Sequence, residues 1–215
     1  MSIGVFSAAK DPTYTRLIMG DRYVDMTEGF IEEEDPMAVY KQAGQTEMFL
    51  GITFNNIMVS FYAFALGLFT ALGTVYIMVS NGIMLGAFQF FFFQKGLFWT
   101  SFLTIWIHGT LEISAIVIAG AAGTIMGNSF MFPKSYSRVE SFKRGARDGM
   151  KLVIGLVPIF ITAGFLEGFV TRLTEMPTAL KVLIIVASIG FILFYFSYYP
   201  RLIYQSYKHQ QKYVS

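Results

Sequence analysis

The stretch MFLGITFNNIMVSFYAFALGLFTALGTVYIMVSNGIMLGAFQFFFFQ, residues 48–94, contains no charged side chain in 47 consecutive positions. A membrane-spanning helix needs about 20 mostly apolar residues, so this run is long enough for two spans. Helices are expected rather than strands, because backbone groups in lipid must be satisfied within their own segment. The pair Asn81-Gly82 is typical of a tight turn, which predicts spans over Ile52–Val79 and Gly82–Lys95. The second span is then short, which leaves a half-spanning helix open.

The composition of the whole chain also indicates a membrane protein. Of its 215 residues, 54% are hydrophobic and 14% are charged, and the mean hydropathy is +0.54. Soluble domains carry about 25% charged residues. Further apolar runs at 97–130, 152–171 and 182–200 predict three more spans, so the expected fold is all-α: a polytopic transmembrane helical bundle of about five spans. The absence of cysteine excludes disulfides, thiol nucleophiles and zinc-thiolate sites.

The distribution of charge divides the chain into three parts. Residues 1–47 hold four basic and nine acidic side chains and are expected to form an acidic arm outside the cytoplasm, with a short ordered element. Residues 48–200 form the transmembrane domain, whose loop at 129–151 holds six basic and two acidic side chains. Basic loops tend to remain in the cytoplasm, so this loop and the tail, residues 201–215, are expected inside. The start of the chain does not resemble a signal peptide.

Ionisable side chains inside the apolar runs are the strongest indication of a site. His108 and Glu112 are four residues apart and share one helix face. The expected topology places Asn55, Asn56 and Glu167 of other spans at a similar depth. Intramembrane ionisable residues usually face the bundle interior and pair with one another, so these five are expected to contact across helices. Two interpretations remain open: a hydrogen-bonded network that fixes helix register, or an ion, proton or ligand site.

No specific catalytic motif accompanies these polar residues. A zinc protease helix would show H-E-x-x-H where this chain has HGTLE at 108–112, and the only other histidine, His209, lies in the tail. One histidine and two glutamates could ligate a metal, but neither a metal nor a cofactor nor a catalytic residue is expected. An intramembrane hydrolase is the least favoured class. Nucleic-acid binding is not expected either, because orientation beside the lipid bilayer explains the basic loop.

Small residues at a spacing of four predict close helix packing in the membrane. The series are Ala119, Gly123 and Gly127; Ala63, Gly67 and Ala71; and Gly82 with Gly86. These contacts are expected within the chain, with subunit contact in a homo-oligomer as the alternative. Gly109, beside His108, is expected to allow the close approach of another backbone.

Four motifs in order resemble the stage II sporulation protein M family of bacterial integral membrane proteins. They are FNNIMVSFYAFALG at 54–67, VSNGIMLGAF at 79–88, HGTLEISAIVIAGAAG at 108–123 and AGFLEGFVT at 163–171. The resemblance covers residues 37–171 well and the last span loosely. The motif positions carried over are Asn55, Asn56, Asn81, Gly82, His108, Gly109, Glu112, Gly120, Gly123, Glu167 and Gly168. The family pattern usually has a proline where this sequence has Ser114.

The resemblance implies a function and a location. The founding member of the family, in spore formers, is a scaffold that gathers peptidoglycan-degrading enzymes at the septal membrane during engulfment. An organising protein of the bacterial cytoplasmic membrane is therefore expected, with other membrane or cell-wall-remodelling proteins as partners. A transporter or channel that uses the histidine and glutamate cluster is the alternative. The resemblance also implies a further span before the acidic arm, and IGVFSAAKDP at 3–12 looks like the exit of such a helix.

Overall fold

The computed structural model describes residues 1–42, 44–69 and 71–214, and every regular element in these ranges is a helix. The arm contains α1 (Ser2–Lys10), α2 (Pro12–Met19), α3 (Asp21–Glu32) and α4 (Val39–Gln42). The long helices are α5 (Gln45–Leu66), α6 (Ala71–Gln94), α7 (Phe98–Met131), α8 (Arg138–Phe165), α9 (Thr178–Leu193) and α10 (Tyr199–Val214). The short elements are the 3-10 turn η1 (Gly67–Phe69) and the π-helical turns η2 (Leu166–Val170) and η3 (Phe194–Tyr198).

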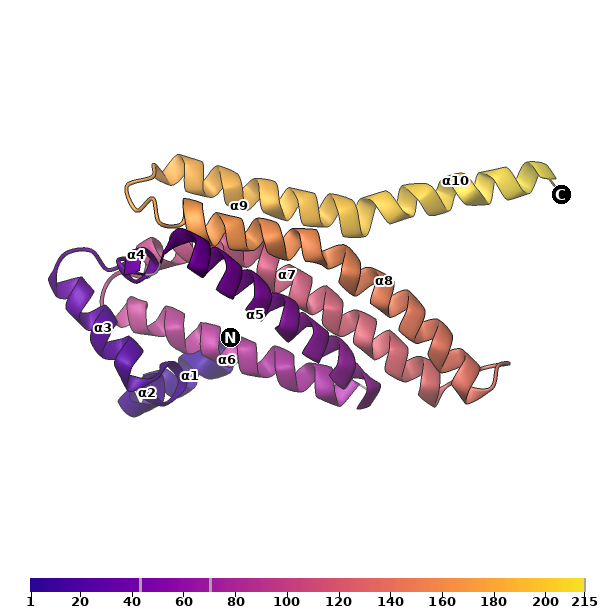
Figure 1. Cartoon of the computed structure of the whole chain (residues 1–215), viewed down its shortest axis with the longest axis horizontal. Coiled ribbons are helices and arrows are strands. Elements are labelled where there is room, and N and C mark those ends of the chain that lie inside the picture. Colours follow the sequence, from indigo (N-terminus) through magenta and orange to yellow (C-terminus); the bar gives the residue numbers. More distant parts are fainter. Residues whose placement is uncertain (43, 70, 215) are drawn as a thin grey trace.

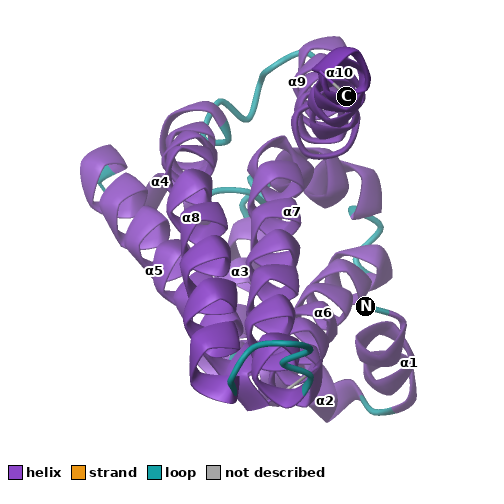
Figure 2. Cartoon of the chain, turned by 90° about the vertical axis from the view of Figure 1, so that its right-hand side faces the viewer, coloured by secondary structure: helices purple, strands orange, loops and turns teal. Residues whose placement is uncertain are grey.

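Within the described ranges, five helices are long and apolar enough to cross a membrane, which confirms the predicted all-α polytopic bundle. The third of them, α7, is the central helix and packs against α5, α6, α8 and α9 (Figures 1 and 2). In its most apolar stretch 56% of the residues are buried, compared with 11% in the span formed by α9 and its continuation. The bundle is thus organised around α7, and α9 is attached to one side of it.

The predicted turn at Asn81-Gly82 is wrong, because both residues lie inside α6. The chain reverses earlier, near Gly67–Phe69, and the 24 residues of α6 also rule out a half-spanning second helix. The Asn81 side-chain amide donates a hydrogen bond to the Ile77 carbonyl at 2.9 Å, so this polar group is satisfied within the helix. Gly82 instead makes room for α1, since a Cβ there would lie 2.9 Å from the Met1 nitrogen.

Most of the expected loop at 129–151 is helical, and only residues 132–137 connect α7 to α8. The hydroxyl of Ser137 accepts a hydrogen bond from the Glu140 backbone N–H at 3.3 Å, which caps the start of α8. The basic residues follow on its first turns, where Arg144 pairs with Glu140 at 2.8 Å. Charge indicates on which side of the membrane a segment lies, but it does not decide whether that segment is helical.

The arm folds against the bundle rather than standing apart from it. Its apolar side chains Val24, Met37 and Tyr40 form a buried cluster with Phe91 and Phe92 near the end of α6. This contact explains the aromatic run at the end of α6: part of it forms the surface on which the arm packs. The arm therefore has a fixed position over one end of the long helices.

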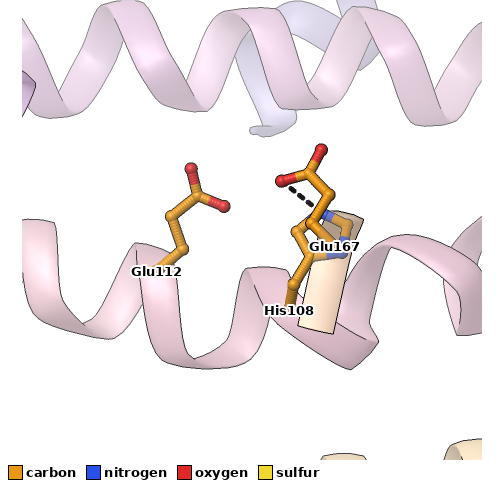
Figure 3. Close-up of side chains that lie close together, drawn as sticks. All are labelled: His108, Glu112 and Glu167. Atoms are coloured by element: carbon orange, nitrogen blue, oxygen red, sulfur yellow. Dashed lines mark ion pairs between the residues drawn. The ribbon is translucent and has the colours of Figure 1, made fainter. Parts of the chain in front are cut away.

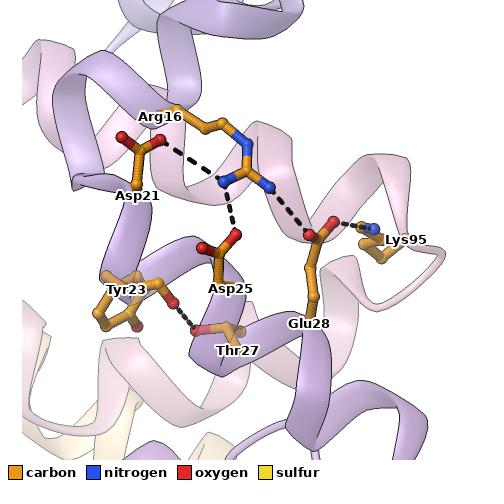
Figure 4. Close-up of polar contacts among 7 residues, drawn as sticks. All are labelled: Arg16, Asp21, Tyr23, Asp25, Thr27, Glu28 and Lys95. Carbon is orange, nitrogen blue, oxygen red and sulfur yellow. Dashed lines mark hydrogen bonds and ion pairs between the residues drawn. The ribbon is translucent and has the colours of Figure 1, made fainter.

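Ion pairs connect the helices of the arm with one another and with the end of α6 (Figure 4). Arg16 lies between three acids, with its guanidinium 2.6 Å from Asp25, 3.2 Å from Glu28 and 3.5 Å from Asp21. Glu28 also pairs with Lys95, which follows α6, at 2.5 Å. The ion pairs thus join α2, α3 and the end of α6, and they account for part of the acidic excess of the arm.

Close packing of glycines characterises the opposite end of the bundle. A Cβ on Gly123 would collide with the Phe64 carbonyl, and a Cβ on Gly67 would collide with the backbone of Gly123. Gly120 and Gly127, from the same side of α7, are also buried. The backbones of α5, η1 and α7 therefore approach one another as closely as glycine allows, which is the packing that small residues at a spacing of four favour.

Candidate functional site

Near the arm, α7 and η2 bring three ionisable side chains together (Figure 3). His108 and Glu112 project from consecutive turns of α7, and Glu167 projects from η2. The His108 Nε2 atom lies 3.5 Å from the Glu167 Oε2 atom. One ligand atom from each of the three residues lies within 4.8 Å of the others. The His108 and Glu167 side chains are only 6% and 14% exposed, so their interaction is shielded from solvent.

The π-helical turn η2 determines where Glu167 points. At its end, the Thr171 N–H donates to the Leu166 carbonyl at 2.8 Å, five residues back, and the Thr171 hydroxyl donates to the same carbonyl at 3.1 Å. The hydroxyl oxygen also lies 3.1 Å from the His108 Nδ1 atom. Single π turns widen a helix locally and occur often at functional sites. This one places both Glu167 and Thr171 against the imidazole of His108.

The two asparagines of α5 have different environments. Asn56 is buried and lies beside the Glu112 carboxyl group in the wall of one cavity. Asn55 is exposed, although it lines the same cavity. Adjacent residues on a helix point about 100° apart, so only one of the pair can face Glu112 directly. The expected contacts across helices therefore run from α7 to α5 through Asn56 and from α7 to η2 through Glu167.

A cavity of about 610 Å³ adjoins the cluster and extends between α5, α6 and α7. Sites for small ligands usually occupy about 300–1,000 Å³ and combine apolar walls with a few polar groups. Besides the five polar residues described above, its walls include Tyr40, Thr74, Met78, Asn81, Gly82, Phe88 and Thr124. Since His108, Glu112 and Glu167 all border this space, a small molecule or a hydrated ion inside it could reach them.

The two glycines beside the cluster have different roles. Gly168 lets η2 approach α5, because a Cβ there would lie 3.1 Å from the Phe49 Cβ atom. Gly109 does not allow the close approach of another backbone, so that expectation is wrong. A Cβ on Gly109 would meet only the side chains of Ile105 and Ile113 of its own helix, at 3.6 and 3.8 Å. Gly109 borders the cavity instead, where the missing side chain leaves space beside His108.

Sequence reasoning missed two residues of the site, Tyr40 and Thr171. The buried Tyr40 ring of the arm lies edge-on to the His108 ring, with 6.3 Å between centroids. Burial, and secondarily the charge of Glu167, raise the pKa of the Tyr40 phenol well above its usual range. Thr171 ends the motif AGFLEGFVT, four residues after Glu167, and that spacing was an available signal. No comparable signal in the sequence points from Tyr40 to His108.

The family model for stage II sporulation protein M matches residues 1–172 of the chain. No match was found among curated proteins or among solved structures. The matched range runs from α1 to the end of η2, so it includes every residue of the cluster together with Tyr40 and Thr171. The helices α9 and α10 lie beyond it.

Proposed function

The chain belongs to the stage II sporulation protein M family, and we propose that it is a scaffold that assembles cell-wall-remodelling enzymes in the bacterial cytoplasmic membrane. The observation that carries this proposal is the family match over residues 1–172, which covers the arm and four of the five candidate spans. The chain has no motif specific to a known class of enzyme. In this role the protein organises other proteins and does not itself catalyse a reaction.

The packing of α9 supports an assembling role. This helix contacts α7 along one side, while Leu183 and Val186 on its other surfaces are 62% and 59% exposed. In a membrane, lipid covers such a surface, and a helix of a partner protein can replace the lipid with little change in apolar burial. The outward surface of α9 is therefore where we place the contact with partner proteins.

Imaging of partner enzymes tests the scaffold proposal. Each membrane-anchored peptidoglycan hydrolase of the host is tagged with a fluorescent protein in cells with and without the gene for this chain. We expect at least one tagged enzyme to lose its focused position at the septal membrane upon deletion, and the full chain to restore it. Normal positions for all of them in the deletion strain would contradict the proposal. The replacements Leu183→Arg and Leu180→Arg in α9 then test the proposed surface at matched abundance.

The orientation belongs to the same proposal: we place the arm outside the cytoplasm and the start of α8 inside. The chain has no cysteine, so a single introduced cysteine reports its own side. Ser135, exposed between α7 and α8, and Glu175, exposed between η2 and α9, lie on opposite sides in this orientation. With a membrane-impermeant thiol reagent, Glu175→Cys should be labelled in intact cells and Ser135→Cys only after lysis. The reverse pattern would invert the orientation.

A further inference from the structure

Thr171 contacts the Nδ1 atom of His108, so the Nε2 atom is the nitrogen that faces Glu167. A hydroxyl has one proton, and the Thr171 hydroxyl donates it to the Leu166 carbonyl, which can only accept. When the Thr171 hydroxyl donates to Leu166, its oxygen accepts from the Nδ1–H of His108 at the 3.1 Å contact. In the neutral imidazole this leaves the proton on Nδ1 and a lone pair on Nε2. A histidine that binds a metal is oriented in the same way, by a hydrogen bond from its other nitrogen.

The lone pair of His108 faces the two carboxyl groups. Its Nε2 atom lies 3.5 Å from the Glu167 oxygen, and one ligand atom from each of His108, Glu112 and Glu167 lies within 4.8 Å of the others. Acceptor atoms at these distances repel one another unless a proton or a metal ion lies between them. Two protons, one on each carboxyl group, or one divalent ion would compensate both carboxylates. Compensation of both matters in this buried setting, where an uncompensated charge is costly.

The spacing of the three atoms fits one metal ion. Two ligands bound at about 2.1 Å to a tetrahedral ion lie about 3.4 Å apart, which is close to the observed 3.5 Å between His108 and Glu167. The set that includes Glu112 is wider, with ligand atoms within 4.8 Å of one another, so a small side-chain rotation is needed before all three can bind one ion. A histidine nitrogen and two carboxylate oxygens suit zinc and similar divalent ions. The adjoining cavity of about 610 Å³ has room for water as a fourth ligand.

We propose that His108, Glu112 and Glu167 bind one divalent transition-metal ion, with zinc as the representative, and that Thr171 orients the histidine. The ion joins α7 to η2, and Asn56 beside Glu112 extends this connection to α5. The site goes beyond the scaffold proposal and does not depend on it, because binding of an ion requires no partner protein.

The test measures zinc binding to the full-length chain, purified in detergent without a histidine tag and stripped with EDTA. Titration calorimetry and metal analysis should find one Zn²⁺ per chain, and Mg²⁺ should bind far more weakly, since it prefers an all-oxygen set of ligands. Glu167→Gln should weaken zinc binding at least about 100-fold, and Thr171→Val about tenfold. The matched control Glu175→Gln removes an exposed acid outside the cluster and should leave binding unchanged. His209→Gln should also bind normally, which excludes the tail.

Two results would overturn the site: a wild-type chain that holds no zinc at micromolar free ion, or a Glu167→Gln chain that binds zinc as tightly as the wild type. The unfolding temperature in EDTA checks that each variant is folded. If Glu167→Gln does not fold, Glu112→Gln takes its place. Co²⁺ added to the wild-type chain gives an independent measurement that needs no variant. A four-coordinate site produces intense visible absorption that excess Zn²⁺ abolishes, and the lack of that absorption would also reject the proposal.

Discussion

The two ends of α7 are held by different physical means. Toward the opposite end from the arm, Gly123 meets the backbone of α5 and η1 with no side chain between them. Near the arm, His108 and Glu112 face polar partners from α5 and η2 beside a cavity of about 610 Å³. The glycine end depends on close contact and tolerates no added volume. The polar end has spare volume and depends on the pairing of its charges and hydrogen bonds.

This difference separates the parts of the molecule that stabilise the fold from those that are available for function. A dry contact between backbones leaves no room for a ligand, so Gly67 and Gly123 specify architecture. A buried histidine and two acids beside a cavity cost stability unless they are paired. Such residues serve to bind a ligand or to fix the register of neighbouring helices. Substitutions at the two ends should accordingly destabilise the protein for different reasons: added volume at the glycine end and lost pairing at the polar end.

The largest effect is expected from Gly123→Ala at the close-packed end. The new methyl group would collide with the Phe64 carbonyl, which belongs to a helix backbone and cannot move aside as a side chain can. We expect the free energy of unfolding in detergent to fall by about 3 kcal/mol. The matched control is Gly155→Ala in α8, where a Cβ has no neighbour within 4 Å. Equal stability of the two variants would show that the contact is looser than described.

At the polar end, stability should depend on the hydrogen-bonding groups of a side chain rather than on its volume. Glu112→Leu removes the polar group beside Asn56 and should lower the free energy of unfolding by about 2 kcal/mol, because a buried amide loses its polar neighbour. Glu112→Gln retains the shape and a hydrogen-bonding group and should cost less than half as much. Both variants are measured by thermal unfolding in EDTA, which removes any contribution from a bound ion. A Gln variant as unstable as the Leu variant would show that the charge itself stabilises the fold.

The sequence predicted the class of fold and the members of the cluster for simple physical reasons. A run of 47 uncharged residues has few soluble alternatives, and His108, Glu112 and Glu167 are conspicuous because ionisable groups are rare in apolar segments. The turn was placed at Asn81-Gly82 because that pair favours turns in water. Inside a bundle, Asn81 is satisfied by its own helix, and Gly82 makes room for α1.

Other features depend on contacts that local sequence does not encode. Tyr40 reaches His108 only because the arm folds back over the bundle, and this contact joins residues 68 positions apart. The π turn that directs Glu167 inserts an extra residue into an otherwise regular helix, which apolar periodicity cannot reveal. The charge of the segment at 129–151 favours a loop, whereas Ser137 and Glu140 form a helix cap at the start of α8.

Removing an exposed ion pair should change the stability less, and such pairs occur at both ends of the bundle. At the arm end, Glu28 pairs with Lys95 and Arg16 while about one third exposed. Glu28→Gln should lower the free energy of unfolding by about 0.5 kcal/mol, and about 0.5 M NaCl should reduce that difference by screening. Glu32→Gln, an exposed acid on the same helix, is the control and should have no measurable effect. A loss in Glu28→Gln that salt does not change would assign the effect to packing.

The smallest effect is expected at the start of α8, where Glu140 pairs with Arg144 on the exposed surface. The hydrogen bond from Arg144 holds the pKa of Glu140 below its usual range. A carboxyl whose pKa is lower in the folded chain contributes stability above its unfolded pKa and loses that contribution as the pH falls through its folded pKa. Protonation also removes a negative charge from the positive end of the helix dipole. Hydrogen exchange over residues 138–144, corrected for intrinsic rates, should therefore show weaker protection at about pH 3 than at about pH 6. Glu140→Gln should abolish this difference, because its side chain cannot titrate, whereas a difference that persists in Glu140→Gln would point to another acid near the start of α8.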